Sequence, residues 1–173
     1  MNLNFIPVNE ENLTRYLQVG IQSYEEHYLH LWENSDPTPF IDAFLTQQSL
    51  KNALKDSHQL FYIIQCNQKD VGILNLTINN EKGNFLSKNN LLLNKIYLLK
   101  SYSSLGIGTM TLDFVQNLAK NKQKDVIWLY TMKNGNPLLF YLKHGYKIIK
   151  EAFIELPKVL EKEKEMWLMA KNI

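Results

Sequence analysis

The stretch that decides the fold is residues 91–109, LLLNKIYLLKSYSSLGIGT. Residues 91–99 form an apolar run that predicts a strand, and the segment after the loop has the apolar spacing of a helix. A turn from strand to helix leaves unpaired backbone amides at the helix N-terminus, where they and the helix dipole favour an anion, most often a phosphate. Gly106 and Gly108 remove Cβ atoms where a pyrophosphate has to approach the backbone closely. The stretch therefore predicts a phosphate-binding loop.

Two widespread phosphate-binding motifs do not fit this loop. The P-loop has a lysine directly after its last glycine, whereas Thr109 follows Gly108. The dinucleotide fingerprint needs a third glycine at position 111, which is a threonine, and an early strand–helix–strand unit. The two glycines alone therefore do not identify the ligand, and other sequence motifs are needed to identify it.

The sequence around the loop predicts a mixed α/β domain with the order β-α-α-β-β-β-α-β-α-β-β. Apolar runs with β-branched and aromatic residues indicate strands, and apolar steps of three and four residues indicate helices. The expected strands are 3–8, 59–66, 71–78, 91–99, 126–132, 146–156 and 165–172, and the expected helices are 9–31, 41–54, 107 to near 120, and 136–145. The helix after the glycine loop is expected to bury Ile107, Met110, Phe114, Val115 and Leu118.

Length and composition favour a single domain that spans residues 1–173. Of the 173 residues, 45% are hydrophobic and 21% are charged, which is ordinary for a soluble globular protein. The net charge of +2 is small and scattered, so nothing favours a nucleic-acid partner. The N-terminus lacks the pattern of a signal peptide, and no apolar run approaches the ~20 residues that cross a bilayer. We therefore expect a cytoplasmic protein without a membrane partner.

Cysteine and histidine residues predict no metal site. A single cysteine, Cys66, excludes an internal disulfide and a four-thiolate zinc site. His27 and His30 are three residues apart and share a helix face, but a metal site would need at least one more ligand. We therefore expect no metal.

A second motif follows the glycine loop at residues 134–146, NGNPLLFYLKHGY, with the pattern Asn134-x-x-Pro137-x-x-x-Tyr141-x-x-x-Gly145-Tyr. Together with Ser103-x-x-Gly-x-Gly it resembles the GCN5-related N-acetyltransferase (GNAT) superfamily. The motifs of that superfamily are Arg/Gln-x-x-Gly-x-Gly/Ala at a helix start and, later, N-x-x-A-x-x-x-Y-x-x-x-G-F/Y. The resemblance covers the C-terminal half of the chain most strongly, and the order of the elements also agrees.

The resemblance implies a GNAT fold, which is an α/β fold with a central mixed, mostly antiparallel twisted sheet flanked by helices. In this fold splayed strands form a slot for acetyl-CoA. Within the superfamily, the segments 94–108, 127–147 and 166–173 look closest to bacterial polyamine N-acetyltransferases of the PaiA type.

The resemblance also implies roles for individual residues. The amides of residues 105–109 would bind the CoA pyrophosphate, and the end of the strand would pair with the pantetheine arm. The amide of Leu98 would polarise the thioester carbonyl as an oxyanion donor. Tyr141 would protonate the departing thiolate. The complete set implied for the co-substrate is Ile96, Tyr97, Leu98, Ser103, Ser104, Leu105, Gly106, Ile107, Gly108, Thr109, Asn134, Pro137 and Tyr141.

The sequence departs from the family at two positions. Ser103 replaces the usual arginine or glutamine, and Asn94 stands where many relatives have a glutamate that acts as the base. Asparagine cannot accept the proton of the acceptor amine, so deprotonation would pass through water or depend on another acidic residue. The sequence does not choose among three such residues, Glu25, Glu26 and Asp36.

The acceptor pocket is expected to be lined from the first helices. Tyr24, His27, Tyr28 and Trp32 are candidates for this wall, together with Asn94, and core packing is the alternative role for the aromatic residues. The expected activity is direct transfer of acetyl from acetyl-CoA to a primary amine of a small molecule, with a polyamine favoured. The alternatives are transfer to a protein N-terminus, an amino acid or an aminoglycoside, or an acyl-CoA-binding domain without activity. A homodimer also remains open.

Overall fold

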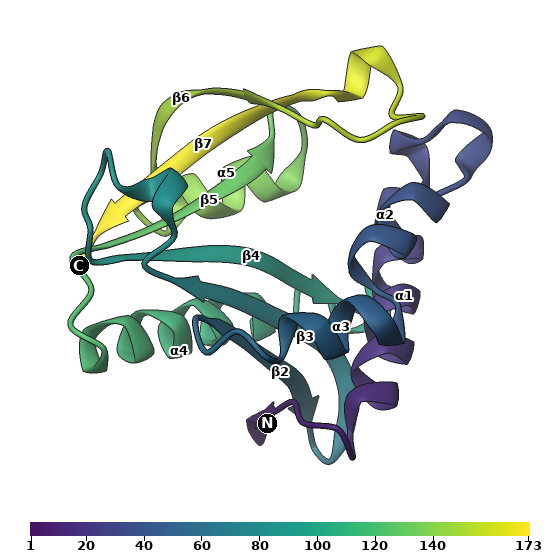
Figure 1. The fold of residues 1–173 in the computed structure, drawn as a ribbon, viewed down its shortest axis with the longest axis horizontal. Helices are drawn as coiled ribbons and strands as arrows, with labels where there is room; N and C mark the ends of the chain where they lie inside the picture. The colour runs from purple at the N-terminus through teal and green to yellow at the C-terminus, as the bar shows by residue number, and fades with distance from the viewer.

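The computed structural model describes residues 1–173, and all of its strands join one seven-stranded sheet with the order β1-β2-β3-β4-β5-β7-β6 (Figure 1). The strands are β1 (Leu3–Pro7), β2 (Gln59–Cys66), β3 (Lys69–Ile78), β4 (Asn90–Leu98), β5 (Val126–Met132), β6 (Lys147–Phe153) and β7 (Glu165–Asn172). The helices are α1 (Leu13–Tyr28), α2 (Thr38–Phe44), α3 (Gln47–Ala53), α4 (Ile107–Asn121) and α5 (Asn136–Lys143). Only β4 and β5 run parallel, which confirms the expected mixed, mostly antiparallel sheet.

The helices cover the two faces of the sheet in separate groups. On one face, α4 and α5 pack on a core that includes Leu74, Ile107 and Val115. On the other face, the helices α1 to α3 pack on a core that includes Tyr16 and Ile73. Neighbouring residues of one strand, such as those at positions 73 and 74, point to opposite faces, so the central strands are buried on both sides.

Two expectations about the helices were wrong. The helix expected at 41–54 is two short helices, because Thr46 starts α3 with a capping box in which its side chain accepts from the Ser49 amide. The first of these helices begins at Thr38, with Pro39 in its first turn. Met110 is 39% exposed, since the buried face of α4 is centred on Thr111 and Val115.

The sheet divides into two halves at the parallel pair β4–β5. Pairing between these strands runs only from Asn90 with Val126 to Leu93 with Leu129. Beyond Leu93, β4 continues beside β3 and β5 continues beside β7, so the two strands diverge (Figure 1). A β-bulge at Asn94 marks the start of the divergence. Leu76 and Asn75 of β3 are adjacent but pair with Leu93 and Lys95 of β4, so Asn94 has no partner on β3. The expected splayed strands are therefore present.

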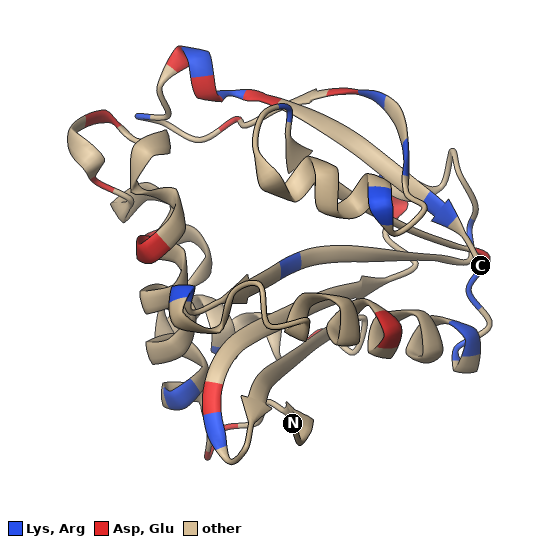
Figure 2. Ribbon diagram, turned by 180° about the vertical axis from the view of Figure 1, so that it is seen from behind, with Lys and Arg blue, Asp and Glu red and all other residues tan.

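Charged residues of both signs are spread over the fold. Basic and acidic segments are interspersed along helices, loops and strand ends (Figure 2). None of the helices combines the length and the apolar character that crossing a bilayer requires.

Candidate active site

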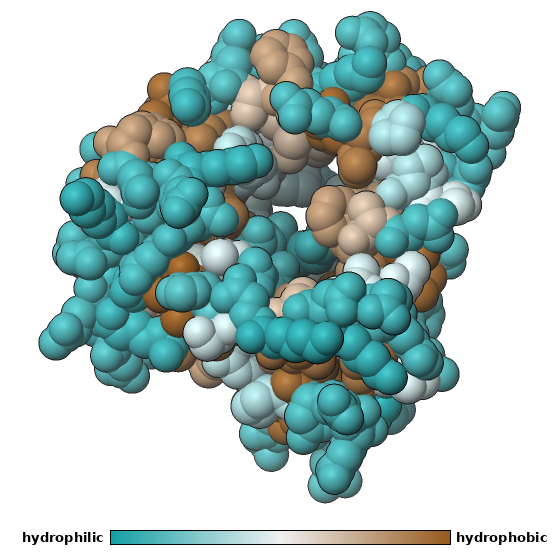
Figure 3. Space-filling model, in the orientation of Figure 1, coloured by the Kyte–Doolittle hydropathy of each residue, from teal (hydrophilic) through white to brown (hydrophobic).

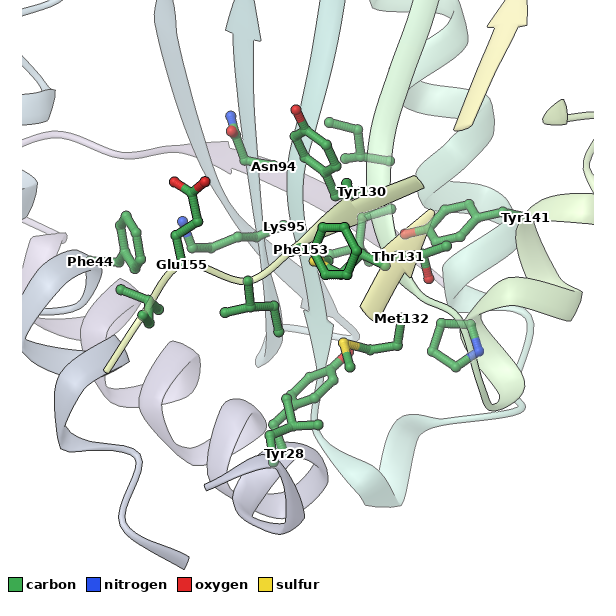
Figure 4. A pocket seen from close by; sticks show the side chains of 18 of the residues that line it. Tyr28, Phe44, Asn94, Lys95, Tyr130, Thr131, Met132, Tyr141, Phe153 and Glu155 are labelled. Atoms are coloured by element: carbon green, nitrogen blue, oxygen red, sulfur yellow. The ribbon is translucent and has the colours of Figure 1, made fainter. Parts of the chain in front are cut away.

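A cavity of about 690 Å³ lies where β4 and β5 diverge. Its walls come from α1, β4, β5, α5 and residues 150–156 at the end of β6. Figure 3 shows the molecule hollowed at its centre in the orientation of Figure 1, and Figure 4 shows the side chains that point into the hollow. The cavity is therefore the direct product of the incomplete pairing between the two central strands.

The far half of β4 turns backbone groups toward this opening. Leu99 donates its amide hydrogen to the carbonyl oxygen of Val71 at 2.8 Å, and alternate residues of an antiparallel ladder face the same side. The amides of Ile96 and Leu98 therefore point away from β3 and into the gap. The carbonyl oxygen of Leu98 accepts a hydrogen bond from Nε2 of His27 at 3.0 Å, and Leu98 lies just beyond the β4 residues that line the cavity.

The loop between β4 and α4 presents a run of amides without partners. None of the amides of residues 105–109 donates a hydrogen bond within the protein, and no side chain caps α4. Gly106 immediately precedes the helix with φ +82°, in the left-handed region that favours glycine, and a Cβ there would meet no atom within 4 Å. Amides that converge at a helix N-terminus form a site for an anion. The loop therefore fits a pyrophosphate.

Gly108 has a packing role in addition to the one expected from sequence. A Cβ at this position would lie 3.2 Å from Cζ of Phe140, so glycine allows α4 and α5 to pack closely. His144 reinforces the same contact, with Nε2 3.1 Å from Oγ1 of Thr109 and Nδ1 2.8 Å from the carbonyl oxygen of Phe140. The second glycine of the loop therefore positions α5 relative to the loop, whereas the first sets the backbone conformation.

Tyr141 reaches the cavity from α5. It packs against Phe140 and Tyr146, and burial raises the pKa of its phenol well above the usual value. The phenol therefore stays protonated at neutral pH. This is the state that a proton donor in the cavity requires.

The neighbours of Tyr141 in the motif lie in different places. Pro137, in the first turn of α5, lines the cavity. Asn134 is exposed in the turn before α5 and does not line the cavity. Its side chain also does not cap the helix, because Gly135 occupies the capping position and no side-chain capping bond forms. Gly145, with φ +83°, ends the helix as expected.

The expected acceptor wall forms in part. Tyr24, Tyr28 and Tyr97 form an aromatic cluster that lines the cavity. His27 does not line it, because its ring turns to the carbonyl oxygen of Leu98. Trp32 is 3% exposed and donates to the hydroxyl of Tyr24 at 3.0 Å, so it belongs to the core.

No carboxylate replaces the missing glutamate at its usual place. Asn94 lines the cavity at the bulge and donates to Oγ1 of Thr77 at 2.8 Å. The three carboxylates considered from sequence do not line the cavity; Glu26, for example, accepts the amide hydrogen of Lys100 at 2.6 Å. The carboxylates that do line it are Glu151, which pairs with Lys133 at 2.8 Å, and Glu155, which forms no ion pair.

Lys95 is a residue of the cavity that the sequence did not reveal as functional. It follows the bulge, and its side chain extends from β4 toward Phe44 of α2 (Figure 4). Burial lowers the pKa of its ammonium group to about 8. The signal in the sequence was a lone basic residue in the middle of an apolar strand, at LLLNKIYLL.

The connection between β6 and β7 closes the cavity on its outer side. Residues 154–156 line the cavity, and the following segment is held to the end of α1 by backbone hydrogen bonds. The amide of Glu33 donates to the carbonyl oxygen of Lys158, and the amide of Leu160 donates to that of Leu31, both at 2.9 Å. Figure 1 shows this connection reaching from the top of the sheet to the loop that follows α1.

Cys66 takes no part in the site. It is 4% exposed in the core at the end of β2 and does not line the cavity.

Known proteins share this architecture. The structure of the PaiA N-acetyltransferase of Thermoplasma acidophilum in complex with coenzyme A is similar, with a TM-score of 0.78, 18% sequence identity and 100% of both chains covered. The structure of the ribosomal-protein-S18-alanine N-acetyltransferase of Escherichia coli is also similar, with a TM-score of 0.70 and 13% identity. The alignment covers 99% of this chain and 94% of the Escherichia coli chain. An uncharacterized N-acetyltransferase from the pepI 3′ region of Lactobacillus delbrueckii subsp. lactis is 21% identical over 144 residues, which are 83% of each chain.

The family comparison covers the site itself. Residues 57–148 match the acetyltransferase (GNAT) domain family. The match begins just before β2 and ends in β6, so it includes the diverging strands, the loop at Gly106 and the cavity residue Tyr141. The chain therefore belongs to the acetyltransferase (GNAT) domain family and is an N-acetyltransferase.

Proposed function

We propose that the protein transfers the acetyl group of acetyl-CoA directly to a primary amine of a small molecule, within a complex that holds both substrates. The observation that carries the proposal is the slot between β4 and β5, with unpaired loop amides at one end and the cavity at the other. A slot of this form accommodates an extended anionic ligand whose reactive end reaches the cavity.

The backbone of the chain supplies most of the donor site. The amides of residues 105–109 bind the pyrophosphate, and the free edge of β4 at Ile96 pairs with the pantetheine arm as an added strand would. Acetyl-CoA supplies the activated acyl group. The amide of Leu98 donates to the carbonyl oxygen of that group.

Two side-chain functions complete the proposed mechanism. The phenol of Tyr141 holds the proton that the leaving sulfur takes. The proton of the acceptor amine leaves through water or to Glu155, which lines the cavity without an ion pair, because Asn94 cannot accept it and Glu151 is engaged by Lys133. The mechanism therefore rests on positioning and hydrogen bonding more than on a strong base.

A polyamine as the acceptor is a narrower proposal, which rests on the resemblance to PaiA-type enzymes. The charges of the cavity wall do not form an acidic groove, since Lys82, Lys95 and Lys150 face it together with two glutamates. A polyamine is therefore one arm of the acceptor panel, beside amines of other charge.

The test measures thiol release from acetyl-CoA with a panel of primary amines, using wild type and Tyr141→Phe. We expect kcat to fall about 100-fold in the variant, with little change in the KM for either substrate, because only the proton is lost. Tight CoA binding without turnover of any amine would show a binding domain instead of an enzyme. Turnover unaffected by the substitution would remove only the acid role of Tyr141.

A further inference from the structure

Lys95 is a cation in the acceptor cavity without a partner. Its Nζ lies 4.6 Å from the ring centroid of Phe44 and 5.8 Å from that of Phe40. It forms no ion pair and no hydrogen bond, and burial is the sole cause that lowers its pKa to about 8. Ring faces compensate only part of the lost hydration of an ammonium group, which has three N–H donors to satisfy. The arrangement leaves the charge available to a ligand.

Lys133 is another lysine of low exposure, and its charge is compensated by carboxylates. The side chain of Lys133 is 15% exposed, and its ammonium has two carboxylates, Glu151 at 2.8 Å and Glu165 at 3.5 Å. Lys95 faces the cavity with none. Glu155 also lines the cavity but does not come within ion-pair distance of Lys95. Figure 4 draws the Glu155 carboxylate on the same side of the cavity as Lys95, but no carboxylate of the chain forms an ion pair with this ammonium group.

We propose that Lys95 binds a carboxylate of the acceptor, so that the substrates of this enzyme are small primary amines that carry a carboxylate. One ammonium group balances one negative charge, which matches a carboxylate better than a phosphate dianion. The proposal rests on the proposed acetyl transfer, and it names the class of acceptor for the same site.

The placement of Lys95 also sets the shape of this acceptor. In Figure 4, Phe44 and Tyr141 lie on opposite sides of the cavity, and Lys95 extends toward Phe44. The amine has to reach the β4 edge near Tyr141, whereas the carboxylate is held at the Phe44 end. The two groups are therefore separated by a short chain, which contacts apolar wall residues such as Met132 and Ile154.

The experiment compares acceptors that share one amine and differ at the other end. 4-Aminobutyrate, n-butylamine and 1,4-diaminobutane present a carboxylate, a methyl group and a second ammonium at the same distance, and glycine and 6-aminohexanoate vary the spacing. We expect the kcat/KM of wild type for 4-aminobutyrate or 6-aminohexanoate to exceed its kcat/KM for n-butylamine and for 1,4-diaminobutane by about tenfold or more.

Variants at position 95 assign the preference to this side chain. Lys95→Met should abolish the preference through the KM for 4-aminobutyrate, and Lys95→Glu should favour 1,4-diaminobutane. Lys95→Arg should retain the preference for the carboxylate. Lys69→Met makes the same change on the neighbouring strand outside the cavity and should leave every value as in wild type. Lys150→Met lowers the charge of the cavity wall equally and should change the preference much less.

Several results would overturn the proposal. A wild-type preference for 1,4-diaminobutane, a carboxylate preference that survives in Lys95→Met, or an equal loss in Lys150→Met would each exclude a pairing with Lys95. Calorimetry separates this failure from a failure of the proposed function. If no amine is turned over, weaker binding of 4-aminobutyrate to Lys95→Met than to wild type, both with CoA present, would still support the carboxylate site. Equal binding would refute it.

Discussion

The ammonium group of Lys95 is placed where its charge costs stability. Its folded pKa of about 8 lies below the ordinary value of 10.5, so the folded state favours the neutral amine relative to the unfolded chain. Below pH 8 the group is protonated in both states, and the folded protein holds a poorly hydrated charge. Between pH 8 and 10.5 the unfolded chain binds more protons, so this contribution to the free energy of unfolding rises with pH. The cost is therefore greatest at neutral and acidic pH.

Lys95→Met should remove this cost. We expect the free energy of unfolding at pH 7 to increase by about 1–2 kcal/mol, because the methionine keeps the apolar contacts of the side chain without its charge. The gain should shrink toward pH 10.5. Urea denaturation at pH 7 and pH 10 measures both values, and Lys69→Met is the control, with an expected change of less than about 0.5 kcal/mol. A loss of stability in Lys95→Met at pH 7 would contradict the account.

The position of Lys95 also shows what the sequence could not predict. In a regular strand Lys95 would lie on the same face as Leu91 and Leu93, which are buried in the core under α4. The bulge at Asn94 shifts the alternation by one residue, so that Lys95 and Tyr97 point to the opposite face. No residue type in this stretch requires a bulge. The residues of the loop and of α5 were predictable because motifs carry them.

At the scale of elements, α4 is a helix whose N-terminus lacks every ordinary cap. Its first amides have no partner, and Ser103, which precedes the loop, donates its own amide hydrogen to the carbonyl oxygen of Lys100. Serine is too short to reach around a pyrophosphate, whereas arginine can bind one with two hydrogen bonds. The proposed binding of CoA by this loop therefore depends on backbone amides.

Ser103→Arg should bind CoA more tightly than wild type, by several-fold to about tenfold, because a charged hydrogen bond is added. Calorimetry with CoA measures the change. Asn121→Arg adds the same charge at the other end of α4 and should leave the dissociation constant as in wild type. Equal or tighter binding by wild type than by Ser103→Arg would contradict the prediction.

The sequence predicted the strands better than the short helices. The runs at 59–66 and 126–132 are confirmed to the residue, because each is a continuous apolar segment bounded by polar turns. The helical region at 41–54 was not resolved into α2 and α3, since Thr46 interrupts it through a local capping bond that outweighs the apolar spacing around it. Met110 was assigned to the core from spacing alone, but the face of α4 is set by its packing on β4 and β5.

At the scale of the whole molecule, the two halves of the sheet are joined at one end and open at the other. The joined end is the pairing of β4 with β5 up to Leu93. At the open end, the connection between β6 and β7 spans the gap and is held to the segment after α1 through Val159, which bridges to Trp32 and is 4% exposed. The outer wall of the acceptor cavity therefore depends on a contact between segments far apart in the sequence.

Val159→Ala should loosen this contact locally. We expect the free energy of unfolding to fall by about 1–2 kcal/mol, and hydrogen exchange at the amides of Glu33 and Leu160 to accelerate more than exchange in the central strands. Val71→Ala, a matched truncation at a fully buried position of β3, should lower stability without this selective acceleration. Uniform acceleration in Val159→Ala would mean that the connection opens only with the whole fold. Selective acceleration that a bound acceptor reverses would show that the acceptor stabilises this wall of the cavity.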